Sequence, residues 1–163
     1  MKKQGFTLIE LMVVIVIMGI LAAVAVPKLF GMIAKSKASE VGPAAGEYVK
    51  LQQAYFAEKV MYGTWQNIGY TGPGTAPSNN TSSTYSTNFR YDGGAITSET
   101  TAAAIGWQAS NIAKLNDCSA GTHWQVTTKV VGSDSKDAYE AQMASDSNGG
   151  CAAVTPSFTL IGK

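Results

Sequence analysis

The sequence predicts an α+β protein in which one long N-terminal helix is followed by a small antiparallel sheet. An apolar run from Leu11 to Val26 leads into a helical pattern that ends near Met61. Short segments with alternating apolar residues, separated by turn sequences, follow in the second half of the chain. We therefore expect a long helix at residues 6–61 and a globular domain at residues 62–163.

The composition suits one ordinary domain with an apolar appendage. The chain has 163 residues and a formal net charge of +1, so no nucleic-acid partner is indicated. Charged residues make up 14% of the sequence, against about 25% in a typical soluble domain. The shortfall comes partly from the uncharged run between Leu11 and Val26.

As a helix, the segment 6–26 would be about 32 Å long, close to the thickness of a bilayer core. Three interpretations compete. A secretory signal peptide explains the basic start, but its apolar stretch should be shorter, although Ala23-Val24-Ala25 does match a cleavage site. A plain transmembrane anchor explains the length but leaves Glu10 unexplained. A third possibility is a helix that occupies the bilayer only temporarily and later packs against copies of itself.

Glu10 favours the third interpretation. A carboxylate among apolar residues costs several kcal/mol unless it is paired, so it is a functional candidate by default; near the interface it can also extend its carboxylate to water. If the chain is cut after Gly5, Phe6 carries a free amine one helical turn before Glu10. In a bundle, the carboxylate of one copy can then neutralise the amine of a neighbour.

The segment Gly5-Phe6-Thr7-Leu8-Ile9-Glu10 with its apolar run resembles the prepilin signature of type IV pilins and type II secretion pseudopilins. The resemblance covers residues 1–30 and implies a leader at residues 1–5. A prepilin peptidase would cut between Gly5 and Phe6 and N-methylate Phe6. The subunit would leave the inner membrane, which it spans once, and an assembly machine would build it into a helical filament through Glu10.

Gly19 and Pro27 are further candidates for assembly. Both weaken a helix, so the stretch between them is expected to bend or unwind. In the family, this region can lose helical order when subunits pack into a fibre. Gly19 also forms a small pair with Ala23, which permits close helix approach. Lysines flank the apolar run on both sides, so lysine counting does not decide its orientation.

The second part of the helix has one apolar face, formed by Val41, Ala44, Tyr48, Leu51 and Tyr55. We expect Gly42-Pro43 to kink it. The family architecture packs this half on the sheet and leaves the first half protruding. A polar loop is expected at residues 75–88, and strands at Phe89–Tyr91, His123–Val131, Tyr139–Met143 and Phe158–Ile161. Residues 101–116 are compatible with a helix or a strand.

Two cysteines, Cys118 and Cys151, lie in the C-terminal half. An even count fits one disulfide in an oxidising compartment, and two free buried thiols are the alternative. The late pair resembles the disulfide-bounded C-terminal region of pilins.

No catalytic constellation is visible, so the chain is not expected to be an enzyme or to need a cofactor. His123 is the one histidine and is interpreted as a strand-edge residue. The segment from Asp146 to Gly150 begins like a calcium loop but lacks the later acids. Calcium at Asp134, Asp137 or Asp146 remains an option, because the similar major pseudopilins use calcium in C-terminal loops.

The sequence thus predicts a subunit of a type IV pilus-like filament that serves adhesion, motility or DNA uptake. Within the same family, a pseudopilin that drives protein secretion from the periplasm is the alternative. A membrane-anchored ligand-binding module is the alternative of another class, and an aromatic-lined pocket would distinguish it.

Overall fold

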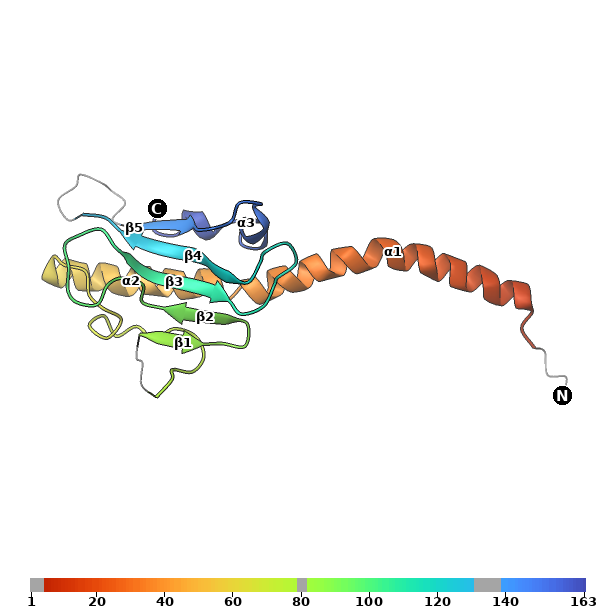
Figure 1. Cartoon of the computed structure of the whole chain (residues 1–163), viewed down its shortest axis with the longest axis horizontal. Coiled ribbons are helices and arrows are strands. Elements are labelled where there is room, and N and C mark those ends of the chain that lie inside the picture. Colours follow the sequence, from red (N-terminus) through yellow and green to blue (C-terminus); the bar gives the residue numbers. More distant parts are fainter. Residues whose placement is uncertain (1–4, 79–81, 131–138) are drawn as a thin grey trace. The chain divides into compact units, whose positions relative to one another are not determined.

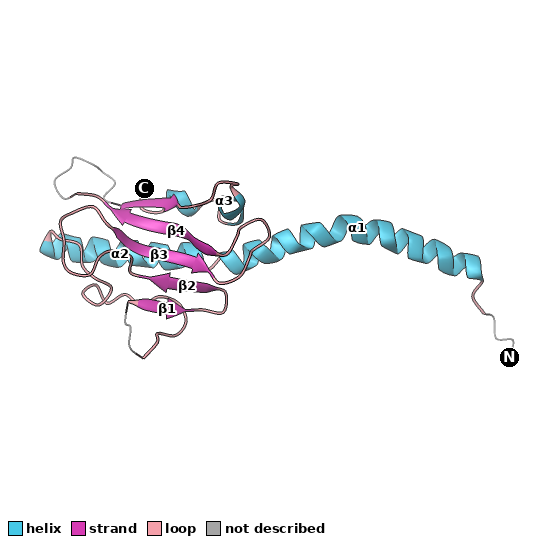
Figure 2. Ribbon diagram, viewed as in Figure 1, coloured by secondary structure: helices cyan, strands magenta, loops and turns pink. Residues whose placement is uncertain are grey.

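The computed structural model describes residues 5–78, 82–130 and 139–163. It has a long helical N-terminal part and a five-stranded antiparallel sheet, which is the predicted α+β, pilin-like fold (Figure 1). The chain divides into two compact units, residues 1–33 and residues 34–163. The first unit is helical from Leu8 onward, and the second contains the sheet (Figure 2).

The helical part consists of α1 (Leu8–Ala38) and α2 (Val41–Lys59). The break lies at Ser39–Glu40, so the kink expected at Gly42-Pro43 was placed wrongly. Pro43 is the third residue of α2, where a backbone N–H has no partner within the helix, so its missing donor costs nothing there. Glu40 instead accepts hydrogen bonds from Ser86 Oγ at 2.5 Å and Tyr91 OH at 2.9 Å, which anchors the break to the sheet.

The strands are β1 (Ser83–Tyr85), β2 (Phe89–Asp92), β3 (Ile105–Asn111), β4 (Gly121–Thr128) and β5 (Tyr139–Met143). Each strand pairs antiparallel with the next, in the order β1-β2-β3-β4-β5. The strands expected at β2, β4 and β5 are confirmed, and the ambiguous segment 101–116 contains β3. β1 lies inside the segment expected to be a loop.

A short helix, α3 (Gly150–Val154), and a 3-10 helix, η1 (Phe158–Leu160), end the described chain. The strand predicted at Phe158–Ile161 was wrong. Local bonds from Phe158 N to Thr155 O and from Ile161 N to Phe158 O, both 3.1 Å, close turns instead. Pro156 has no backbone N–H and cannot donate a hydrogen bond to a neighbouring strand, which favours the turn.

The core of the second unit lies between α2 and the sheet. On the helix side, Val41, Ala44 and Tyr48 of the predicted apolar face are buried, and Leu51 and Tyr55 are half-buried. The sheet contributes mainly aromatic side chains: Phe89, Tyr91, Trp107, Trp124 and Tyr139. Burial raises the pKa of Tyr48, Tyr91 and Tyr139, so these phenols stay neutral at physiological pH.

Gly106 allows the helix to pack closely on β3. A Cβ at this position would lie 2.0 Å from Tyr48 OH, so no side chain fits there without a shift. The carbonyl of Gly106 also accepts a hydrogen bond of 3.0 Å from Trp65 Nε1. Helix α2 and strand β3 therefore pack tightly against each other in the core of the second unit.

Val60 follows α2 in the left-handed conformation, with φ 55° and ψ 28°, and its N–H donates to Phe56 O. A β-branched residue is strained there by about 1–2 kcal/mol, whereas glycine is not. Val60 is 58% exposed, so little packing is lost on truncation. We expect Val60→Gly to raise the free energy of unfolding by about 1 kcal/mol, measured by urea unfolding of the detergent-solubilised chain.

The matched control is Ala57→Gly, an exposed position inside α2. Ala57→Gly should have the opposite effect and lower the free energy of unfolding by about 1 kcal/mol. A lower urea midpoint for Val60→Gly would contradict the strain argument.

Candidate assembly interface

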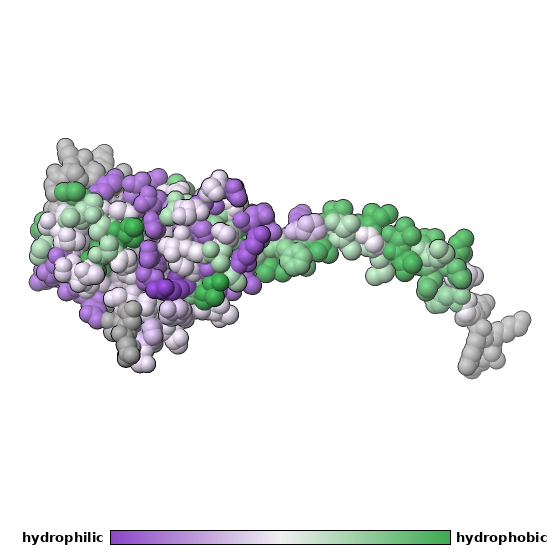
Figure 3. Space-filling model, in the orientation of Figure 1, coloured by the Kyte–Doolittle hydropathy of each residue, from purple (hydrophilic) through white to green (hydrophobic). Residues whose placement is uncertain are grey.

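The first unit presents an apolar surface on all sides of α1. All of its large apolar side chains from Phe6 to Ile33 are exposed, by 42% at Ile33 to 90% at Phe6. Figure 3 shows this apolar surface over α1. Within the described residues, this is a helix long and apolar enough to cross a membrane, by length and composition. Such a surface requires lipid or other protein around it.

The helix begins with a capping box at Thr7 and Glu10. Thr7 N and Thr7 Oγ1 both donate to Glu10 Oε2, at 2.8 and 2.6 Å, and Glu10 N lies 3.4 Å from Thr7 Oγ1. This reciprocal pattern satisfies backbone donors that a helix start leaves without partners. Sequence reasoning missed Thr7, although the spacing Thr-x-x-Glu was the available signal. Glu10 therefore has a role within its own helix besides any role between copies.

The predicted processing site lies just before this helix. Gly5 and Phe6 are exposed and outside regular secondary structure, and α1 begins at Leu8. A peptidase needs accessible backbone outside regular secondary structure, and this peptide bond offers both. Residues 1–4 of the predicted leader lie outside the described residues. The cleavage and the methylation of Phe6 stay predictions.

Gly19 and Pro27 both lie within the continuous helix α1. The unwinding expected between them is not seen, because the helix assignment is continuous there, whereas Figure 1 shows that α1 is curved. A Cβ on Gly19 would meet no atom within 4 Å, so the surface there is open to another helix. The role of both residues in assembly stays a prediction.

Cys118 and Cys151 form the expected disulfide, with a Cα–Cα distance of 4.5 Å. It joins the loop before β4 to α3. Gly150 permits this approach, because a Cβ there would lie 2.5 Å from Asp117 O. Asp146 accepts hydrogen bonds from Cys151 N at 3.0 Å and Ala152 N at 2.8 Å, which caps the start of α3.

The predicted calcium ligands give no assembled site in the described residues. Asp134 and Asp137 lie outside them, and the carboxylate of Asp146 is occupied by backbone donors. His123 lies near both cysteines, but their sulfurs are bonded to each other. His123 is buried, with its ring nitrogens 3.1 Å from Ala144 O and 2.9 Å from Ser119 O, so the strand-edge interpretation was wrong.

The cavities of the second unit give little support to a ligand-binding module. Among the described residues that line them, the aromatic side chain is Phe158. The tryptophans at positions 65, 107 and 124 are buried in the core. None of these three cavities is therefore the aromatic-lined pocket that would indicate such a module.

Comparison with known proteins agrees with the N-terminal geometry. Residues 1–26 match the family described as the prokaryotic N-terminal methylation motif. The chain is 43% identical over 70 residues to the type IV major pilin protein PilA of Myxococcus xanthus, covering 42% of this chain and 32% of that protein. It is 37% identical over 87 residues to the type IV major fimbrial protein FimA of Dichelobacter nodosus, covering 50% and 54%.

A third relative is the type IV major pilin protein PilE of Neisseria gonorrhoeae, 35% identical over 96 residues, covering 58% of this chain and 54% of that protein. The chain thus spans about a third to a half of the length of these curated relatives. No solved structure matches it.

Proposed function

We propose that this chain, whose N-terminal segment is similar to that of type IV pilins, is the structural subunit of a type IV pilus-like filament. The observation that carries the proposal is the exposed apolar helix of the first unit, whose segment from Phe6 to Val26 has one charged residue, Glu10, close to the predicted cleavage point. An apolar helix of this kind suits first a bilayer and then a bundle of its own copies.

The proposed sequence of events is the one that the resemblance to prepilins implies. The subunit spans the inner membrane once, prepilin peptidase cuts between Gly5 and Phe6, and Phe6 is N-methylated. An assembly machine then transfers the helix from lipid into the filament core. The role is structural rather than enzymatic and needs no cofactor, and calcium at Asp146 is not part of it. Adhesion, motility and DNA uptake are the processes that such a filament serves.

A pilus is favoured over a secretion pseudopilus. The relatives reported above carry pilin or fimbrial names, and the disulfide Cys118–Cys151 encloses the C-terminal region, as the resemblance to pilins implies. The two assignments differ in where the filament is found, since a pilus extends from the cell surface and a pseudopilus stays in the periplasm.

Subunits in sheared surface fibres should lack residues 1–5 and carry one methyl group on Phe6. Intact-mass measurement and N-terminal sequencing of the fibres test this directly. The unassembled membrane pool of the same cells serves as the control and should include full-length chain. Fibres made of subunits that begin at Met1 would contradict the processing, and the absence of this chain from every surface fibre would contradict the pilus assignment.

A further inference from the structure

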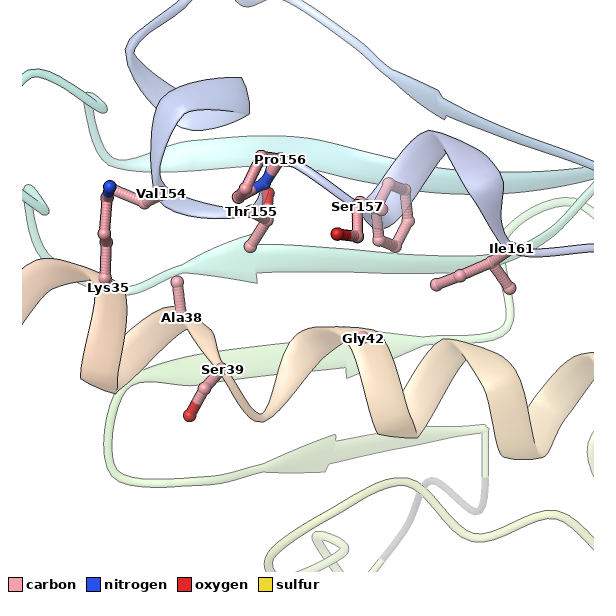
Figure 4. A pocket seen from close by; sticks show the side chains of 10 residues that line it. Lys35, Ala38, Ser39, Gly42, Val154, Thr155, Pro156, Ser157 and Ile161 are labelled. Carbon is pink, nitrogen blue, oxygen red and sulfur yellow. The ribbon is translucent and has the colours of Figure 1, made fainter.

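The second unit contains a cavity of about 300 Å³ between its helical edge and its C-terminal segment. Figure 4 shows Lys35 at one end of the cavity and Ile161 at the other. On the helical side, the lining residues are Lys35, Ala38, Ser39 and Gly42. Opposite them lies the stretch from Val154 to Phe158, which is apolar apart from two hydroxyl groups.

Apart from Lys35, the helical wall of this cavity is made of small residues. A Cβ on Gly42 would meet no atom within 4 Å, so the space above it is open. Ile161 also borders a neighbouring cavity of about 410 Å³, which the helix lines with Gly46, Val49 and Lys50. Because Ile161 lines both cavities, we treat them as one groove, whose lining on the helix runs from residue 35 to residue 53. Small residues at such a surface allow a second helix to approach closely.

The charges along this groove are positive. The described residues that line the two cavities include three lysines, at positions 35, 50 and 163, and no acidic side chain. Lys35 forms no ion pair with any described residue. An occupant that matches this surface has an apolar exterior and a negative charge that can be placed beside the ammonium group of Lys35.

We propose that this groove receives the N-terminal helix of a second copy of the chain, with Glu10 of that copy against Lys35. The proposal rests on the filament function above and specifies its docking surface. The segment from Phe6 to Val26 is apolar around its circumference and contains one charged side chain, Glu10. Among the described contacts, its Oε2 accepts from Thr7. A carboxylate offers about four acceptor positions, which leaves room for Lys35 as well as a neighbouring amine.

Two substitutions test the surface, each with a matched control. Lys35→Glu places a like charge opposite Glu10, and Lys37→Glu makes the same change at an exposed position that does not line the cavity. Gly42→Leu fills the open space, and Ala57→Leu adds the same side chain at an exposed position of α2 outside the groove. Fibre yield should fall at least about tenfold for Lys35→Glu and Gly42→Leu and stay near wild type for both controls.

Protease resistance of the membrane-inserted, cleaved subunit must match wild type in all four variants, which shows that the second unit is folded. A photoreactive amino acid at Ser157 then identifies the occupant. In wild-type fibres, it should cross-link to a peptide within residues 6–26 of another copy. A cross-link to a different segment of the chain, to lipid or to fatty acid overturns the proposal.

The proposal also fails if Lys35→Glu and Gly42→Leu assemble like wild type. In that case the pilus assignment stands, because wild-type fibres containing this chain are still observed. If no such fibres form in wild-type cells, the filament function itself is wrong. The two failures are therefore distinguishable in one experiment.

Discussion

Cells whose subunit carries Glu10→Ala should insert and cleave it normally but form about a hundredfold fewer fibres, or none. Removing the carboxylate lowers the cost of placing this segment in a bilayer, so a mere anchor would function normally or better. If Glu10 pairs with the Phe6 amine of a neighbouring copy in the fibre, the same change leaves that amine without its partner. Breaking a buried pair in this way costs about 3–5 kcal/mol at every subunit. Counting sheared fibres against the membrane pool of cleaved subunit measures the effect.

The capping box supplies the controls for this prediction. Glu10→Gln keeps an acceptor for Thr7 and so preserves the cap, but it has no charge. It should fail to assemble as Glu10→Ala does. Thr7→Ala removes the hydroxyl contacts and keeps the charge, so it should assemble. The opposite result, with Thr7→Ala defective and Glu10→Gln normal, would show that Glu10 acts only as a helix cap.

Removal of the disulfide should have the second largest effect. The bridge closes a loop with a sequence separation of 33 residues, and loop-closure entropy for that length corresponds to about 3–4 kcal/mol. A chain with Cys118→Ser and Cys151→Ser should unfold at a clearly lower urea concentration than wild type. Near-UV circular dichroism of the buried Trp124, which reports on the second unit, follows the transition.

Insertion of the apolar helix should be unchanged in this double variant, because the cysteines lie outside the first unit. Wild-type chain treated with a thiol reductant is the matched control and should resemble the variant. An unaltered unfolding midpoint in both samples would contradict a stabilising role for the bridge.

The elements that were predicted correctly are those whose residues form a clear apolar pattern within one short stretch of sequence. The apolar run and the alternation around Trp124 correspond to α1 and β4. The predicted strand at the C-terminus was wrong because Phe158 and Leu160, which would share one face of a strand, lie in a 3-10 turn where Phe158 is buried and Leu160 is 63% exposed. β1 was missed because its residues are polar, although Ser83 and Thr84 are buried against the rest of the sheet.

The residues of the candidate site likewise fall into those that the sequence predicted and those that it did not. Gly5, Phe6 and Glu10 were predicted because they belong to one contiguous signature. The groove beside Lys35 was not, because it depends on packing residues 35–42 against residues 154–161, which are far apart in sequence. The helix break at Ser39–Glu40 depends on Tyr91 and Ser86, which fold back onto Glu40 from the sheet. No periodicity in the sequence reports such contacts.

The strand order β1-β2-β3-β4-β5 has a consequence for how the protein is made. Because every strand pairs with its neighbour in sequence, each pairing closes only a short loop, and the sheet has a low contact order. Pairing can therefore proceed from β1 onward without waiting for the last residues of the chain. Because Cys151 follows β5 in the sequence, the disulfide can close only after all five described strands have been synthesised.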